Sequence, residues 1–451
     1  MIAPFNKSIL PLLASFLFLG SSSTYRACTY YGYPQGTDSL RIREGILSQT
    51  AQKINYKKDG KTVAVITLTE PVMVAMAEQE EKWGYFQFPT IGRSDDGTLI
   101  IGWSMSEDSH KAYGLKLKRQ ATLMMSKDGG KNWLPQDKKY FAIRGNYKVE
   151  MSNGDIIQVT NPTSKEVASY KCFPKSLGKR KGSEFYKQSE LPEELQGVYF
   201  YHWDASEKKA SYFHATINDG NALRNAIDGS MPVVWWGDIK ELKDHSLLAG
   251  IYPYYYLDDN NEVSASAVAF YRSDDEGKSW DYVGKIPFHI SDIDTANKDN
   301  NVGYQEPSYE ILNDSTLICV MRTGSASPMY KAFSDDLGKT WTIPEPFTPN
   351  GVKPKLFMLN SGVLVLVSGR PGIQVRFSLD GTGREWTDPI EMMPFMEPDG
   401  RYRWDVSCGY ASVIEIDDDS FFLTYSDFTT KDKNGEVRKS IWGRKITIKK
   451  K

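Results

Sequence analysis

The chain has 451 residues, enough for one large domain or several smaller ones. Lys and Arg number 55 against 57 Asp and Glu, so the formal charge of −2 provides no global attraction to nucleic acid or to an anionic membrane. Aromatic residues are abundant (26 Tyr, 20 Phe and 11 Trp), which suits β-strands and also surfaces on which aromatic rings pack against sugar rings.

The first residues have the pattern of a secretory signal peptide. Ser8–Gly20 is a 13-residue, mostly apolar stretch that follows a basic start and precedes small residues. It is too short to span a membrane as a helix, so we expect residues 1–27 to be a signal peptide and residues 28–451 to form a single domain. The protein is then secreted, periplasmic or at the cell surface, and Cys28 is a candidate for lipid attachment.

An eight-residue pattern, Ser-x-Asp-x-Gly-x-x-Trp, occurs at Ser126–Trp133, Ser273–Trp280 and Ser334–Trp341, with a longer variant at Ser378–Trp386. Strand-like sequence precedes and follows each copy, which predicts a β-hairpin. Ser and Asp can bond backbone N–H groups inside the turn, Gly can take a positive φ, and Trp can pack back on the hairpin. Since every residue has a structural role, these aspartates are not expected to be catalytic.

The spacing of the copies predicts the architecture. Their first residues are 147, 61 and 44 positions apart, and a unit of roughly 45–70 residues fits one four-stranded propeller blade. We therefore predict an all-β fold, a β-propeller of about six four-stranded blades, with seven as the alternative. The lysine-rich stretch Tyr170–Glu190 is expected to be an exposed loop, or else a basic patch for an acidic glycan.

The repeated pattern resembles the Asp box (BNR repeat) of the sialidase, or neuraminidase, superfamily, whose catalytic domain is a six-bladed propeller. Other stretches are similar to the family's site motifs, in the same order. "GWSMSEDSHKAYG" places Asp108 as the acid/base, and "YQEPSYEILNDSTLICVMRTG" places Glu306 as the base and Arg322 as a carboxylate-binding arginine. "GVLVLVSGRPGIQVRFSLDG" places Arg370 as another such arginine, and "CGYASVIEIDDDSFFLTYSDF" places Tyr410 as the nucleophile.

The chain departs from the family at the first carboxylate-binding arginine. Gln87 stands at that position in "FQFPTIGRSDDGTLIIGW". The resemblance thus implies a clamp of two arginines and an amide, unless Arg401 or Arg403 reaches the site. This departure leaves open whether sialic acid itself is the substrate.

The chemistry implied by the resemblance is that of an exo-acting, retaining glycoside hydrolase. A sugar with a carboxylate on its anomeric carbon repels a carboxylate nucleophile, so a neutral tyrosine is a sensible substitute. Free Tyr titrates near pH 10, about three units above neutrality, and Glu306 could take its proton. Asp108 would protonate the leaving oxygen and then activate water.

Two other functions remain open. A propeller polysaccharide lyase acting on uronate-containing glycans would need a histidine or tyrosine base, and the chain has five histidines: His110, His202, His214, His245 and His289. A glycan-binding propeller without turnover would fit the loss of the arginine at Gln87. In all three cases the expected partner is a glycan, and the oligomeric state is not predicted.

No cofactor or metal is predicted. The chain has no phosphate-binding glycine motif and no metal-ligand spacing. Three scattered cysteines, Cys172, Cys319 and Cys408, are expected to be small buried side chains, although one disulfide among them remains possible.

Overall fold

The computed structural model describes residues 46–47, 50–108, 123–136, 144–145, 148–160, 174–227, 235–292, 294, 302–324, 327–395, 403 and 405–451. The predicted signal peptide, Cys28, Cys172, His110 and Arg401 lie outside these residues. The described part is all-β, and its only helical segments are two short 3₁₀ turns, η3 (Gln188–Glu190) and η4 (Glu193–Leu195). None of its helical segments has the length and apolarity that crossing a membrane requires.

The strands form six groups, and within each group they are named in their order across the sheet. One sheet contains β8 (Leu134–Pro135), β7 (Met124–Ser126), β6 (Leu99–Met105), β5 (Tyr85–Arg93) and β9 (Arg144–Gly145). The longest contains β10 (Lys148–Glu150), β11 (Ile156–Thr160), β14 (Val198–Asp204), β15 (Lys209–Asn218), β20 (Ser279–Ile286), β19 (Ala267–Ser273), β18 (Leu247–Tyr254) and β17 (Trp236–Glu241). A small sheet contains β12 (Gly178–Arg180), β13 (Ser183–Lys187) and β16 (Leu223–Ile227).

Three further sheets come from the C-terminal half and the first strands. One contains β21 (Gln305–Ile311), β22 (Leu317–Arg322), β23 (Met329–Ser334) and β24 (Glu345–Thr348). Another contains β1 (Ile46–Leu47), β28 (Ile390–Glu391), β27 (Ile373–Ser378), β26 (Leu364–Gly369) and β25 (Val352–Met358). The last contains β2 (Gln52–Lys58), β3 (Lys61–Leu68), β31 (Val437–Lys450), β30 (Ser420–Lys431) and β29 (Ala411–Asp417), with β4 (Val72–Met76) also paired to β31.

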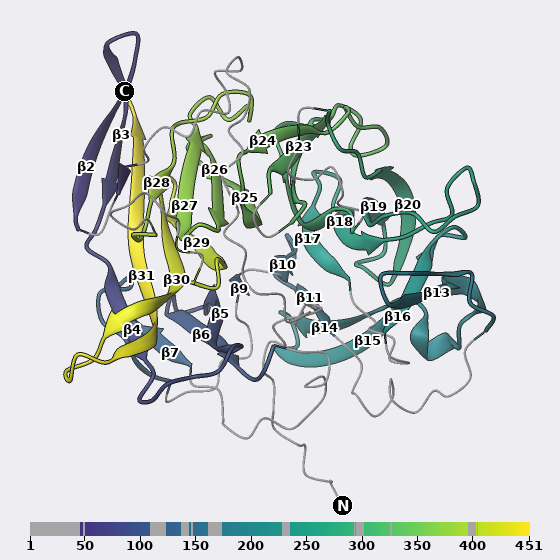
Figure 1. The fold of residues 1–451 in the computed structure, drawn as a ribbon, viewed down its shortest axis with the longest axis horizontal. Helices are drawn as coiled ribbons and strands as arrows, with labels where there is room; N and C mark the ends of the chain where they lie inside the picture. The colour runs from purple at the N-terminus through teal and green to yellow at the C-terminus, as the bar shows by residue number, and fades with distance from the viewer. Residues whose placement is uncertain are drawn as a thin grey trace, which may run out of the picture.

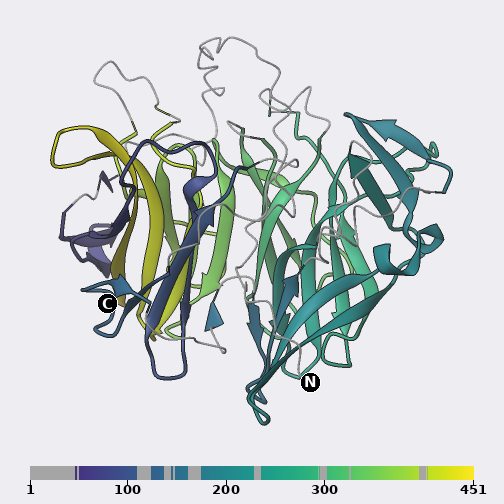
Figure 2. The ribbon, with the colours of Figure 1, turned by 90° about the horizontal axis from the view of Figure 1, so that it is seen from below.

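These sheets are arranged side by side as in a β-propeller. The first strands of neighbouring sheets contact one another, with β17 beside β21, β21 beside β25, and β29 beside β5. Strands from both ends of the chain share one sheet, and Figure 1 shows β3 next to β31. Figure 2, turned by 90°, shows the strands of neighbouring sheets running in broadly the same direction. The first strands of consecutive sheets are therefore brought together at the centre.

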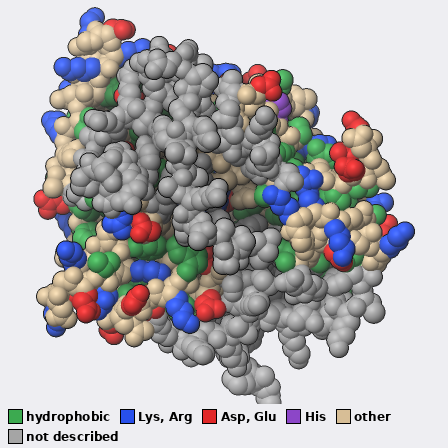
Figure 3. All heavy atoms as spheres, viewed as in Figure 1, with side chains coloured by type: hydrophobic (Ala, Val, Ile, Leu, Met, Phe, Trp, Pro, Cys, Tyr) green, Lys and Arg blue, Asp and Glu red, His purple; other side chains and the backbone are tan. Residues whose placement is uncertain are grey.

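The hydrophobic core lies between neighbouring sheets. Phe377 of β27 and Phe421 of β30 are fully buried in one such cluster, and Phe270 of β19 and Tyr309 of β21 in another. Removing aromatic rings of this size from water provides a main driving force for sheet-on-sheet packing. On the described part of the face in Figure 3, positive and negative side chains are interspersed, as the small net charge would suggest.

The repeated pattern forms the hairpin turns that the sequence predicts. In the copy that starts at Ser273, the Ser hydroxyl donates to Asp275 at 2.8 Å and accepts from the Gly277 amide at 2.8 Å. The Trp280 indole N–H donates to the Gly277 carbonyl at 2.9 Å, and Gly277 has a φ of 88°. The other three copies make the same three bonds.

Three of these turns also pack against a neighbouring sheet. The rings of Trp341 and Phe270 are 4.5 Å apart, and those of Trp386 and Phe347 are 5.3 Å apart. The first turn packs against the last sheet, because Trp133 lies 5.6 Å from Phe422 of β30. The repeated pattern therefore joins neighbouring sheets and links the first sheet to the last.

The expectation of an exposed loop over Tyr170–Glu190 is wrong for the part that the structure describes. β12 and β13 form an antiparallel hairpin there, and Lys181 and Gly182 at its tip both have positive φ (46° and 80°), as a tight hairpin turn requires. Phe185 is 1% exposed. The lysines around Phe185 in the sequence led to the prediction of an exposed loop.

Candidate functional site

The site is built where three of the central strands begin. Phe88 in β5, Glu306 in β21 and Lys353 in β25 each precede a proline and each have a positive φ, of 51°, 48° and 48°. The pairing register of each strand shifts at this point. A non-glycine residue in this region costs about 1–3 kcal/mol and is held there by its surroundings, a feature that clusters at functional sites.

A half-buried tyrosine, a buried carboxylate and a buried arginine meet at this place. The Tyr410 hydroxyl, just before β29, donates a short hydrogen bond to Glu306 Oε1. Arg322 Nη1, at the end of β22, lies 3.0 Å from Glu306 Oε2 and 3.4 Å from the Tyr410 hydroxyl. The side chains of Glu306 and Arg322 are only 3% and 5% exposed, so this ion pair is shielded from water. The three residues predicted for the site from two different stretches are thus in direct contact.

Two more cations border this group. The backbone N–H of Lys353 donates to Glu306 Oε2 at 2.9 Å, and its ammonium lies 5.8 Å from the centre of the Tyr410 ring. Burial first, and then the neighbouring Arg322 guanidinium, lower the pKa of Arg370, while the Glu306 carboxylate acts in the opposite direction. Arg370 also has a positive φ, of 51°. Repulsion between the two guanidinium groups thus contributes to the lowered pKa of Arg370, and a shared role of Arg322 and Arg370 in one anion site stays a prediction.

Gln87 is in β5, next in sequence to a residue that contacts this group. It is fully buried, and among the residues that the structure describes neither atom of its amide has a hydrogen-bond partner. The next residue, Phe88, contacts the Tyr410 ring edge-on with 5.0 Å between the ring centres. A buried amide without partners is costly, so such a group needs an explanation, and a bound molecule is one.

Asp108 approaches the group from the end of β6. Its carboxylate raises the pKa of Arg370, and its Oδ2 accepts a 2.9 Å hydrogen bond from the Trp83 indole N–H. Gly84 makes this approach possible: a Cβ there would lie 2.2 Å from the Ser106 carbonyl oxygen and 2.5 Å from the Asp108 nitrogen. Only a glycine fits between these two segments.

Arg403, the other predicted substrate-binding residue, is held elsewhere. It pairs with Asp405, with both nitrogen–oxygen distances at 3.2 Å and 41% of its side chain exposed. This pairing does not involve Glu306 or Tyr410, so a role for Arg403 in substrate binding stays a prediction. Cys319 and Cys408 are buried free thiols, as expected.

Three of the histidines considered for a lyase have other partners. His202 lies 3.0 Å from Asp155, and His214 bonds the Gln196 carbonyl at 2.7 Å. His245 lies 3.1 Å from Glu241. These contacts belong to the sheet that contains β14, β15 and β17, and none of the three involves Tyr410, Glu306 or Arg322. They do not test His110 or His289.

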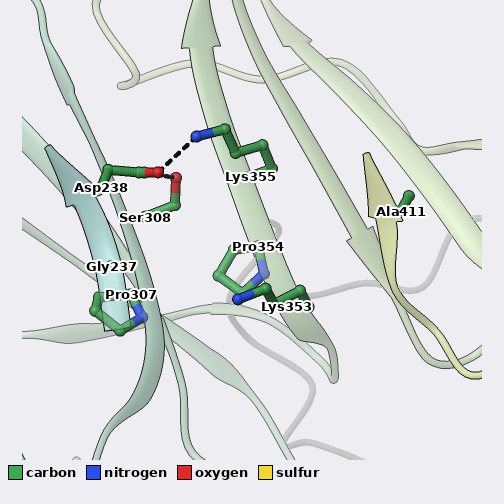
Figure 4. A pocket seen from close by; sticks show the side chains of 8 residues that line it. All are labelled: Gly237, Asp238, Pro307, Ser308, Lys353, Pro354, Lys355 and Ala411. Atoms are coloured by element: carbon green, nitrogen blue, oxygen red, sulfur yellow. Dashed lines mark hydrogen bonds and ion pairs between the residues drawn. The ribbon is translucent and has the colours of Figure 1, made fainter. Parts of the chain in front are cut away.

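A hollow next to the group is lined by a second ion pair (Figure 4). Lys355 Nζ lies 2.6 Å from Asp238 Oδ1, and the Ser308 hydroxyl donates to Asp238 Oδ2 at 2.5 Å. Burial acts to raise the pKa of Asp238, but the nearby lysines and hydrogen bonds outweigh it and hold the pKa below its usual range. Lys353 and Ala411 line the same hollow. Because its charges are paired, we assign this part of the centre a structural role.

Sequence reasoning missed Lys353 and Trp83. The sequence does contain a signal for Lys353. The stretches "YQEP" and "GVKP" both place a non-glycine residue before a proline at the start of a central strand, so Lys353 has the same position in its strand as Glu306. No comparable signal marks Trp83. In the described part of the chain, no group of three or more potential ligands is placed to hold a metal ion.

No family model and no curated protein matches the chain. Among solved structures, it is similar to a protein of unknown function from Dyadobacter fermentans, with 16% identity, a TM-score of 0.55, and coverage of 85% of this chain and 99% of that one. It also matches a Hadza microbial sialidase (14% identity, TM-score 0.44, 83% and 68% covered) and a Penicillium chrysogenum α-L-arabinanase (13%, 0.45, 83% and 98%). The first match shows a shared fold, and the other two, with lower TM-scores, add nothing to it.

Proposed function

We propose that this chain is a glycan-acting hydrolase that removes a terminal acidic sugar, similar to sialic acid, with retention of configuration. In this proposal Tyr410 is the nucleophile, Glu306 its base, and Asp108 the acid and later the base for water. Arg322 and Arg370 bind the carboxylate of the sugar.

The observation that carries the proposal is the hydrogen bond from the Tyr410 hydroxyl to the buried Glu306 carboxylate. A phenol is a weak nucleophile at neutral pH, and a carboxylate in direct contact can take its proton as it attacks. Arg322 and the Lys353 amide hold the other carboxylate oxygen, so Oε1 stays directed at the hydroxyl. A tyrosine that serves only for packing would not need a buried, charged acceptor.

The reaction would proceed in two balanced steps. In the first, the Tyr410 oxygen forms a bond to the anomeric carbon, its proton moves to Glu306, and the bond to the leaving oxygen breaks as Asp108 protonates that oxygen. In the second, Asp108 takes a proton from water, the water oxygen attacks the anomeric carbon, and Tyr410 leaves and recovers its proton from Glu306. Both carboxyl groups end in their starting states.

The charges support an anionic substrate. With Tyr410 neutral and Asp108 protonated, as the first step requires, three cations (Arg322, Arg370 and Lys353) accompany one carboxylate (Glu306), which leaves positive charge in excess for a substrate carboxylate. Arginine can grip a planar carboxylate through paired N–H groups. The amide of Gln87 can supply a hydrogen bond in place of the family's first arginine.

The lyase and the non-catalytic glycan-binding propeller remain the alternatives. We keep about six blades and export from the cell as parts of the proposal. Successive antiparallel strand groups, such as β21 to β24 and β25 to β28, support the blade count.

A product assay with a matched pair of variants tests the proposal. The purified protein is incubated with sialylated, other keto-acid-containing and uronate-rich glycans, and both released sugar and new unsaturated-uronate absorbance are followed. We expect release of an intact terminal acidic sugar, reduced to background in Tyr410→Phe, which keeps the ring against Phe88. Tyr212→Phe, an exposed tyrosine on β15, should retain full activity. Absorbance without hydrolytic release would overturn the scheme and favour the lyase.

A further inference from the structure

A half-exposed tryptophan adjoins the proposed acid. Trp83 is 45% exposed, an unusual state for a side chain that is largely apolar, and its indole N–H is already used in the 2.9 Å bond to Asp108. The polar edge of the ring is therefore directed at the carboxylate, and the exposed area is mainly its apolar part.

The turn that carries Trp83 is fixed in place. The Tyr85 amide donates to the Lys82 carbonyl at 3.2 Å, and the Lys439 ammonium, from β31, donates to the same carbonyl at 2.6 Å. The close packing at Gly84 holds the turn against Asp108. Trp83 is thus presented on a rigid support, a property that favours binding surfaces because little side-chain entropy is lost on contact.

Two further groups lie near the ring. The Lys439 ammonium lies 5.9 Å from its centre, and Phe428 meets it nearly perpendicular, with 6.2 Å between ring centres. Although Asp108 takes the N–H edge and these two groups lie near the ring, Trp83 is still 45% exposed. The exposed area belongs to the same ring whose N–H contacts the carboxylate assigned to protonate the leaving oxygen.

We propose that Trp83 is the platform for the leaving-group sugar and that it positions Asp108 for proton delivery. The inference rests on the proposed function, because it places the leaving group beside the acid. A general acid must lie within hydrogen-bond reach of the oxygen that it protonates, so the sugar attached to that oxygen lies next to Trp83. The flat apolar face of a pyranose matches the exposed indole face.

A platform at Trp83 would favour substrates in which the acidic sugar is linked to a second sugar. Substrates whose acidic sugar is linked to another sugar ring would gain binding from the platform, whereas an aryl glycoside would gain less from the acid because its leaving group needs little protonation. Binding energy from the leaving-group sugar then contributes to turnover as well as to affinity.

Kinetics with two probes, sialyllactose and an aryl sialoside, test this. For Trp83→Ala we expect kcat/KM for sialyllactose to fall about 100-fold and that for the aryl sialoside about 10-fold or less. Trp83→Phe keeps a ring but loses the N–H that bonds Asp108. For this variant, kcat for sialyllactose should fall about 10-fold while KM changes less than about twofold. The acidic limb of the variant's pH–rate profile should also shift. Tyr212→Ala, which removes a 60% exposed aromatic ring on another sheet, is the control and should change neither probe.

Equal losses for both probes in Trp83→Ala, or no loss, would overturn the platform. Failure of the proposed function is separately visible, because the wild type would then hydrolyse neither probe. In that case, titration with lactose alone, followed by indole NMR signals, decides the platform. A lactose-dependent shift that is absent in Trp83→Ala supports the platform, and an unchanged spectrum refutes it.

Discussion

Replacing Glu306 with Gln removes a buried charge while keeping the shape of the side chain. The change leaves the Arg322 guanidinium, 5% exposed, without its carboxylate 3.0 Å away. Two unit charges about 4 Å apart attract by about 4 kcal/mol at an effective dielectric constant of about 20. Breaking a buried pair by removing one partner costs about 3–5 kcal/mol. We expect the lower end of this range, because Arg322 keeps its 3.0 Å bond to the Gly324 carbonyl.

A matched control separates this structural cost from a role in catalysis. Glu310, on the same strand β21, pairs with Lys240 at 3.0 Å and is 9% exposed, but it lies outside the Tyr410 group. Glu310→Gln should also be destabilising. Only Glu306→Gln should abolish turnover per folded molecule, because only Glu306 accepts the Tyr410 proton in the proposed scheme.

The assay combines urea denaturation, followed by tryptophan fluorescence, with sugar release well below the unfolding midpoint. Adding Arg322→Met to Glu306→Gln should restore part of the lost stability, since the unpaired cation is then gone, but no activity. The reasoning is refuted if Glu306→Gln unfolds like the wild type, or if its activity per folded molecule matches that of Glu310→Gln.

Three further outcomes follow from the same structure. Lys353→Met should raise KM for an acidic glycan about tenfold, which corresponds to about 1.4 kcal/mol of lost binding free energy. Adding Gln87→Arg to this variant should recover part of the lost affinity. An unchanged KM in steady-state assays would show that Lys353 does not belong to the anion site. Trp280→Ala, at a fully buried turn residue, should lower the free energy of unfolding in urea by about 3–5 kcal/mol without changing KM. Burial raises the pKa of Glu391 from 4.5 to about 6, so stability from this group is present below pH 4.5 and is lost as pH rises through about 6. The stability lost is at most about 2 kcal/mol, and solvent screening makes it smaller. Glu391→Gln should therefore make the thermal midpoint depend less on pH between 4.5 and about 6.

Local structure was predictable where short-range bonds decide it. The turn at Ser273–Trp280 closes with hydrogen bonds that span at most four residues, so its eight letters contain nearly all of the information. The residue against which the turn packs could not be predicted from the turn itself. The Trp280 ring lies 5.9 Å from Phe200, which is 80 positions earlier in the chain. Such contacts depend on how the sheets are arranged, which no eight-residue pattern states.

The error over Tyr170–Glu190 has the same origin. Lysines on the exposed side of β12 and β13 dominate the composition, while the buried side is defined by residues from other segments, such as Leu223 of β16 opposite Lys187. A two-stranded hairpin without such support would be marginal. Composition therefore suggested a loop where pairing with a distant strand makes a sheet.

The site was predictable in part, because the resemblance marked Glu306, Arg322 and Tyr410 and the structure brings them into contact. The presence of Lys353 beside them was not predicted. Lys353 reaches the group through its backbone amide and its ammonium, and this depends on the positive φ at the start of β25. Trp83 depends on the close approach allowed by Gly84.

In the proposed anion site, Gln87 stands where the resemblance places an arginine, and Lys353 supplies a further positive charge. A third guanidinium would add to the like-charge effect that already lowers the pKa of Arg370. Here the neutral amide of Gln87 adjoins Phe88, whose ring meets one edge of Tyr410, and the third positive charge lies 5.8 Å from the centre of the same ring. A flexible ammonium on a four-carbon stem can also move with the substrate, which a buried guanidinium cannot. In the proposed scheme, the departure at Gln87 thus changes how the site distributes its positive charge, while positive charge remains in excess for the carboxylate of the substrate.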